Sequence, residues 1–80
     1  MTFLDNHRGP FQLVLTRPFV TKPGFFRSEW LTGETEREDV EGEARAFLSD
    51  PRDTIVRVHV WSIREQQFIG GYRGRDVEKR

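Results

Sequence analysis

The segment spanning residues 54–63 constrains the fold more than any other part of the sequence. β-Branched and large side chains alternate along it, with Val56, Val58 and Val60 on one face and Arg57, His59 and Trp61 on the other. Such alternation is typical of a half-buried β-strand. The segment therefore predicts a strand with a valine face suited to a core and an opposite face rich in aromatic and basic side chains.

A second strand is predicted directly after this one. If residues 64–67 form the turn, Ile63 lies opposite Phe68 and His59 lies opposite Tyr72. Residues directly opposite one another share a sheet face. The hairpin is therefore predicted to gather five side chains on the face away from the valines: Arg57, His59, Trp61, Phe68 and Tyr72.

The N-terminal half predicts another hairpin. Residues 11–16 alternate, with Phe11, Leu13 and Leu15 on one face, and Pro18 limits this strand because proline donates no ladder hydrogen bond. Lys22-Pro23-Gly24 has the residues of a type II turn. Residues 25–31 then form the second strand.

Between the two hairpins the sequence predicts one helix. Thr35 and Glu38 match a capping box, in which each side chain accepts a hydrogen bond from the other residue's backbone N–H. An apolar stripe follows at helical spacing, and Asp50-Pro51 ends the helix because the residue before proline avoids the helical region. The stripe consists of Val40, Ala44, Phe47 and Leu48.

The predicted order of elements is β-β-α-β-β, which favours an α+β fold with a small antiparallel sheet of about four strands and one helix on the valine face. The 80 residues form a single domain, in which we expect residues 1–10 and 74–80 to be flexible. The chain has no cysteine, so no disulfide supports it. A domain this small buries only about 60% of its unfolded surface, which favours association with another chain.

The aromatic and basic hairpin face has three readings. It is a docking face for protein, since Trp, Tyr and Arg are common interface anchors, or a platform on which unpaired bases stack. Alternatively it is structural, with Phe25, Phe26 and Trp30 of the first hairpin folded over it or with Trp61 covering Gly70.

The formal net charge of zero conceals a segregated distribution. Residues 29–43 carry seven acids and one arginine, and the flanking segments carry the compensating positive charge. Acidic residues near a helix start are stabilised by the helix dipole and need no function. The alternative is a secondary acidic surface that meets a basic partner, made of Glu34, Glu38 and Glu41.

No motif in the sequence predicts catalysis. His7 and His59 are the only histidines. His59 with Asp53 or Glu65 would make an acid–base pair, but a half-exposed strand histidine is the simpler reading. The acidic spacing does not match a calcium loop. We therefore expect no enzyme activity, no metal and no cofactor. With no apolar stretch near the ~20 residues of a membrane helix and no secretory signal, we expect no membrane partner and a cytoplasmic protein.

Eleven of the thirteen basic residues are arginine, and the sequence VHVWSIREQQFIGGY covers residues 58–72. In length, arginine usage and this ending, the chain resembles short accessory proteins of actinobacterial phages over about residues 35–73. That resemblance implies a factor that binds a host protein. We thus expect a small interaction module that binds a host protein or itself through the aromatic face. The alternative is a single-stranded nucleic-acid-binding protein that uses the same face with Arg73, Arg75 and Arg80.

Overall fold

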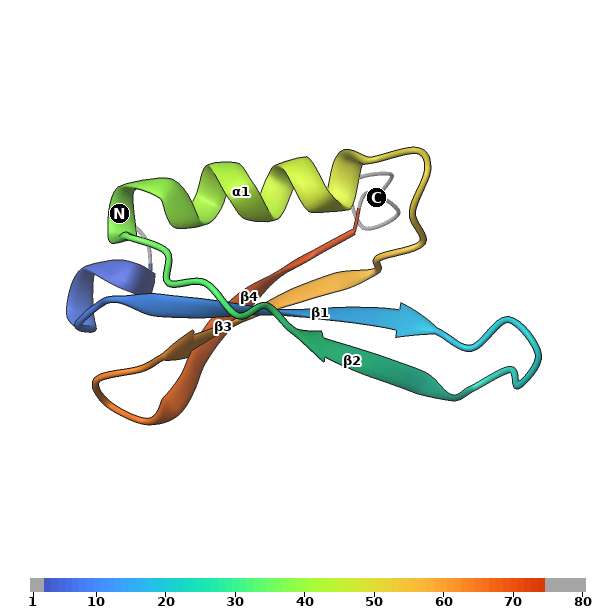
Figure 1. Cartoon of the computed structure of the whole chain (residues 1–80), viewed down its shortest axis with the longest axis horizontal. Coiled ribbons are helices and arrows are strands. Elements are labelled where there is room, and N and C mark those ends of the chain that lie inside the picture. The colour runs from blue at the N-terminus through green and yellow to red at the C-terminus, as the bar shows by residue number, and fades with distance from the viewer. Residues whose placement is uncertain (1–2, 75–80) are drawn as a thin grey trace.

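A computed structural model describes residues 3–74 and shows one helix lying across one face of a four-stranded antiparallel sheet (Figure 1). The strand order is β2-β1-β3-β4, so the two hairpins join in one sheet through the pairing of β1 with β3. This confirms the predicted α+β fold. The elements are a 3-10 helix η1 (Phe3–Asn6), β1 (Phe11–Pro18), β2 (Phe26–Trp30), α1 (Arg37–Ser49), β3 (Arg57–Ser62) and β4 (Gln67–Arg73).

The core lies between α1 and the two central strands. Alternate residues of β1 and β3 point toward the helix and are at most 1% exposed. Val40 and Ala44 of the predicted apolar stripe are fully buried against them, and Phe47 and Leu48 pack at the edge. The strand residues of this core are Phe11, Leu13, Leu15, Val58 and Val60.

The edges of two predicted elements differ in the structure. Val56 precedes β3 and is 38% exposed, so only two of the three valines form the core face. The capping box is also wrong: Glu36 is the N-cap and makes no side-chain cap hydrogen bond. Thr35 instead pairs with Phe11 through two backbone hydrogen bonds of 2.8 and 2.9 Å. Its hydroxyl donates to Glu43 at 3.4 Å, so the threonine belongs to the sheet side of this junction.

The segment before β1 is packed onto the fold. Leu4 of η1 is 4% exposed, and the Phe3 ring lies against Tyr72 with centroids 5.5 Å apart. The guanidinium of Arg37 donates to the carbonyl oxygens of Leu4 and His7. Residues 3–8 of the segment expected to be flexible thus make these contacts with the fold.

The C-terminal end of β4 is also bonded. The Gly74 N–H donates to the Val56 carbonyl at 2.8 Å, and Gly74 is buried. The remainder of the tail predicted to be flexible, residues 75–80, lies outside the described residues, as do residues 1–2.

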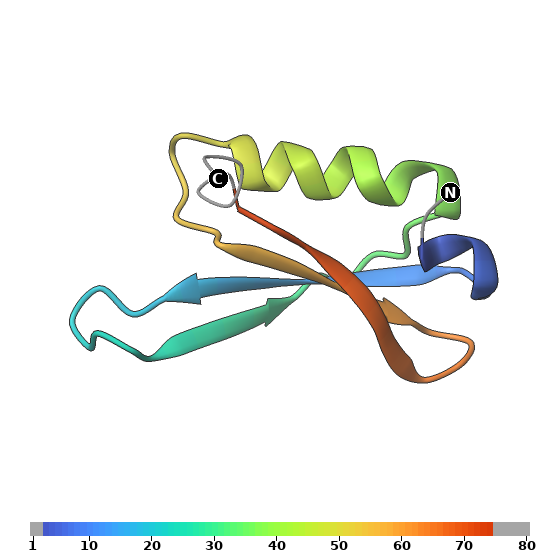
Figure 2. The ribbon, with the colours of Figure 1, turned by 180° about the vertical axis from the view of Figure 1, so that it is seen from behind.

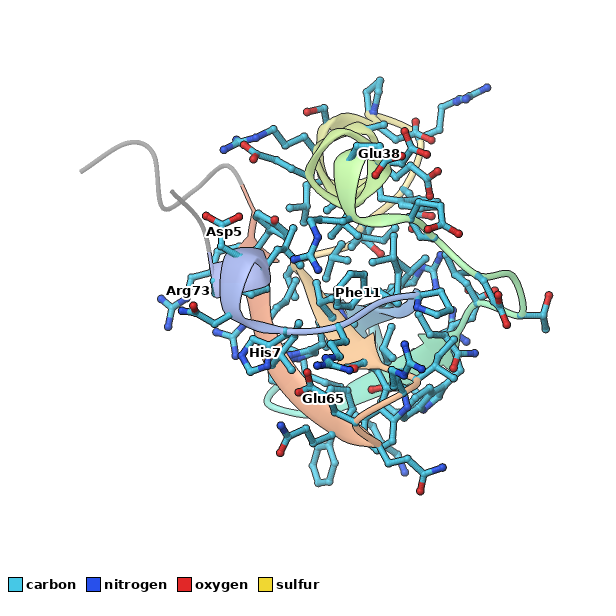
Figure 3. All side chains as sticks on the ribbon, turned by 90° about the vertical axis from the view of Figure 1, so that its left-hand side faces the viewer. Asp5, His7, Phe11, Glu38, Glu65 and Arg73 are labelled. Carbon is cyan, nitrogen blue, oxygen red and sulfur yellow. The ribbon has the colours of Figure 1, made fainter. Side chains whose placement is uncertain are left out.

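Glu65, in the β3–β4 turn, joins that turn to the N-terminal segment. Its carboxylate accepts hydrogen bonds from His7 Nδ1 at 2.8 Å, the Arg8 N–H at 2.7 Å and the Gln67 side chain at 3.0 Å. His7 and Glu65 come together beside the ribbon of the N-terminal segment in Figure 3. These hydrogen bonds, with that from His7 the strongest influence, lower the pKa of Glu65 from 4.5 to about 2.

Two glycine substitutions are expected to change stability in opposite directions. At Gly70 an added Cβ would lie 2.7 Å from the Phe3 ring, so Gly70→Ala should destabilise the protein by about 1–3 kcal/mol. Gly42 is exposed in α1 with open space around it, so Gly42→Ala should stabilise the protein by up to about 1 kcal/mol. Urea denaturation of both variants measures the difference. A Gly70→Ala variant as stable as the wild type would show that Phe3 does not pack on β4.

The free energy of unfolding should also fall in acid, because Glu65 becomes protonated. Because the folded pKa of Glu65 is about 2 and its ordinary value is 4.5, the folded state binds fewer protons between these values. Its contribution is fully present above about pH 4.5 and is lost as the pH falls toward 2. Glu65→Gln should lower stability at pH 7 and flatten this acid limb. Asp53, whose pKa is also lowered to about 2, titrates in both proteins and cancels in the comparison.

Candidate protein-docking face

Three aromatic side chains from three strands meet on the sheet face opposite α1. The rings of Trp30 and Trp61 have centroids 5.4 Å apart, and Phe68 lies 5.5 Å from Trp30 and 4.8 Å from Trp61. We call Trp30, Trp61 and Phe68 the aromatic cluster. Each pair is within the range of favourable ring contacts.

Strand pairing brings these residues together. Val14 of β1 lies opposite both Trp30 of β2 and His59 of β3, so all three side chains share one face. Trp61 lies opposite Phe68 in the neighbouring strand. The cluster therefore spans the sheet from one edge strand to the other, over residues far apart in the sequence.

This face has no second layer among residues 3–74. Seen from both sides, α1 lies on one side of the sheet only (Figures 1 and 2). Val14 is nevertheless only 2% exposed, because its large neighbours on the open face shield it. Trp30 and Phe68 remain 45% and 50% exposed. The cluster covers the sheet beneath it and presents its own outer surface to solvent.

The structure moves one predicted site residue to the other face. Tyr72 lies opposite Val58, and His59 lies opposite Gly71. The cause is a shift of register between Val60 and Trp61, where β4 contains one extra residue, and such a bulge inverts the side chains that follow. Tyr72 is therefore not on the aromatic face, and its placement there was wrong.

Tyr72 instead packs at the edge of the core beneath α1. Its hydroxyl is buried and has no hydrogen-bond partner within the described part of the chain. Burial raises the pKa of Tyr72, with a smaller contribution from Glu41. Trp61 does not cover Gly70 either, because the Phe3 ring occupies that position on the helix side.

The sequence analysis did not predict Trp30 as a member of the aromatic cluster. The sequence analysis allowed the first hairpin to fold over the aromatic face. The structure places Trp30 beside Trp61 in the same sheet, whereas Phe25 and Phe26 are exposed near the far end of the β1–β2 hairpin. The alternation of Phe26, Ser28 and Trp30 was the available signal. That alternation does not by itself show that the strand order brings β2 close to β3.

His59 lies within this face and has no carboxylate partner among residues 3–74. Its ring is half-buried, 5.9 Å from the Phe68 ring centroid. Burial lowers the pKa of His59, and the charge of Arg57 lowers it further. Glu65 is bonded to His7, and Asp53 to Arg17 at 2.8 Å. His59 therefore forms neither of the two acid–base pairs that the sequence analysis considered, with Asp53 or with Glu65.

Next to the cluster on the same face lie two arginines. Arg57 and Arg73 are directly opposite in β3 and β4, and we call them the arginine pair. No carboxylate within residues 3–74 forms an ion pair with either. They line a shallow hollow of about 260 Å³ with His59, Gly71 and Tyr72. Figure 3 shows the side chain of Arg73 projecting outward from the sheet edge.

The predicted acidic surface lies away from the aromatic face. Glu34 and Glu38 are exposed around the start of α1, and Glu41 pairs with Arg45 at 3.0 Å, one turn along the helix. In Figure 3, Glu38 lies at the helix, on the other side of the sheet from the open face. The structure therefore separates these carboxylates from the arginine pair.

Comparison with known proteins gives no assignment: neither a family model, nor a curated protein, nor a solved structure matches this chain. No helix in the described range is long and apolar enough to span a membrane. Residues 3–74 also hold no group of three or more side chains placed to bind a metal ion. What the site does must therefore be argued from its own geometry.

The position of His59 beside Arg57 gives a direct titration test. We expect the pKa of His59, measured by NMR, to lie below the ordinary value of 6.5, and Arg57→Gln to raise it because one of the two causes is removed. An unchanged His59 titration in Arg57→Gln would show that the charge of Arg57 does not act on the His59 ring.

Proposed function

We propose that this protein is a small non-enzymatic interaction module whose aromatic cluster docks another protein surface. The observation that carries the proposal is the combination of Trp30, Trp61 and Phe68 on a sheet face with no second layer among the described residues. Large aromatic side chains, beside arginine, are the anchors most often found at the centres of protein interfaces. A partner would cover the exposed halves of Trp30 and Phe68.

The orientation of the rings favours protein over unpaired bases. The Trp30–Trp61 and Trp61–Phe68 ring planes meet at 73° and 75°, so the rings pack edge to face against one another. A base-stacking platform needs ring faces that are free to receive flat bases. A protein side chain can instead fill the irregular surface that these tilted rings leave.

A second candidate is a single-stranded nucleic-acid-binding protein. The arginine pair favours it, because two guanidinium groups without carboxylate partners among residues 3–74 share a sheet face with the aromatic cluster. Arg75 and Arg80, which the sequence analysis added to this reading, lie outside the described residues. Binding of this kind would weaken steeply and log-linearly with salt.

The origin of the partner also stays a prediction. The resemblance to phage accessory proteins would make it a host protein, with the cytoplasm as the place of action. The absence of catalysis is likewise part of the proposal. It is supported by His59, which is bonded to neither of the carboxylates considered as its acid–base partner, since Glu65 is bonded to His7 and Asp53 to Arg17.

A matched pair of phenylalanine substitutions tests the docking role. Phe68 in the cluster and Phe25 in the β1–β2 hairpin are both exposed, at 50% and 61%. A protein captured from bacterial lysate is purified and titrated calorimetrically against the wild type, Phe68→Ser and Phe25→Ser. We expect Phe68→Ser to weaken binding at least tenfold, because it removes a buried interface anchor. Phe25→Ser should leave the affinity unchanged.

Equal affinity of the two variants would contradict the proposal, as would a loss caused by Phe25→Ser alone. Circular dichroism of both variants confirms that each is folded. Labelled single-stranded oligonucleotides at low salt test the second candidate directly. Binding that is lost on Phe68→Ser and falls log-linearly with salt would replace protein docking with nucleic-acid binding.

A further inference from the structure

We infer that the occupant of the aromatic face is a second copy of this chain, docked so that the arginine pair of each copy lies on the aromatic cluster of the other. The inference rests on the proposed function, since it names the partner of the same face. It follows from the way the two kinds of side chain are divided along the strands.

The face has two unlike ends separated by a central row. Arg57 and Arg73 occupy one row across β3 and β4, and Trp61 and Phe68 occupy another row of the same two strands. His59 and Gly71 form the row between them. Cations therefore lie toward one end of the strands and ring surfaces toward the other.

The arginine end of the face lacks a group that offsets its charge, and the aromatic end lacks a cation, so each end could supply what the other lacks. Like charges directly opposite one another in a sheet destabilise it, and Arg57 and Arg73 have no carboxylate in the described residues to offset this. Guanidinium groups bind favourably over aromatic rings. The one cation–π contact found within residues 3–74, between Arg37 and Phe11, lies elsewhere, so the cluster has no cation of its own.

Symmetry then selects the arrangement. In a two-fold dimer of sheets packed face to face, an axis perpendicular to the strands reverses the strand direction and places each arginine row on the partner's aromatic row. An axis parallel to the strands keeps the rows in place and stacks the cationic ends of both copies together. Charge repulsion disfavours the second arrangement, so the perpendicular axis is the one proposed.

The available surface fits a stable dimer. The Cα extents of the molecule are 37 × 25 × 19 Å, and the sheet runs along the longest of them (Figure 1). A standard interface buries about 800 Å² on each partner, which is close to the size of such a face. Covering Trp30 and Phe68 would also remove exposed apolar surface of the open face from water.

Sedimentation velocity across a wide concentration range tests the dimer. We expect the mass to rise from that of the 9.5 kDa monomer to twice that value. Phe68→Ser and Arg73→Ser should each weaken the dimer at least tenfold, while Phe25→Ser should not change it. A wild type that stays monomeric at all concentrations would overturn the inference.

The absence of cysteine allows the pairing itself to be tested by disulfide trapping. Arg73→Cys and Phe68→Cys, mixed and oxidised, should form mainly the mixed disulfide, because each position faces the other across the proposed axis. Predominant Arg73→Cys homodimers would overturn the proposed pairing. Mixing each variant with Phe25→Cys controls for random collision and should give little product.

Failure of this inference is distinguishable from failure of the proposed function. A monomer that binds a purified partner protein through Phe68 overturns the dimer and leaves protein docking intact. A dimer weakened by Phe25→Ser but insensitive to Phe68→Ser overturns both. A wild type that forms no dimer and binds a single-stranded oligonucleotide through Phe68 also overturns both.

Discussion

One helix of 13 residues covers only one face of this four-stranded sheet, and the other features of the molecule depend on that one-sided cover. Burial of Val40 and Ala44 against the two central strands supplies the main core. Hydrophobic burial is the dominant favourable term in folding, and a chain of 80 residues has little of it to distribute. The second face is therefore left to side chains that lie on the sheet itself.

The aromatic cluster meets this constraint from within the sheet. Val14 belongs to the open face and is still 2% exposed, because Trp30 and His59 flank it from both neighbouring strands. The rings that provide this cover pack edge to face and keep their outer surfaces in solvent. Stability and the proposed docking thus draw on the same residues, so a variant at Trp30 or Trp61 would confound the two, and Phe68 is the better site for substitution.

A single extra residue in β4 separates two environments. Before the bulge, Phe68 lies on the open face, and after it Tyr72 lies beneath the helix, where Phe3 packs on both Tyr72 and Gly70. The N-terminal segment is held in the same region by Glu65, which bonds His7 and the backbone of Arg8. The bulge therefore ends the run of aromatic side chains of β4 on the open face and creates the position at which η1 packs on β4.

Much of the fold was predictable because its signals are local. The alternation along β1 and β3 and the stripe from Val40 to Leu48 each predict the element and its buried face from a few neighbouring residues. The turn at Gly24 was predictable for the same reason, since its positive φ of 88° suits glycine. Four of the five predicted face residues lie on the face assigned to them: Arg57, His59, Trp61 and Phe68.

The sequence by itself determined which segments are strands and helix, which residues of β1 and β3 face a core, and that the opposite face of β3 is aromatic and basic. Only the tertiary structure decided that Trp30 joins Trp61, because that contact requires β1 to pair with both β2 and β3. It also decided the face of Tyr72, since register is set by the turn and the bulge, and a shift of one residue inverts every side chain beyond it.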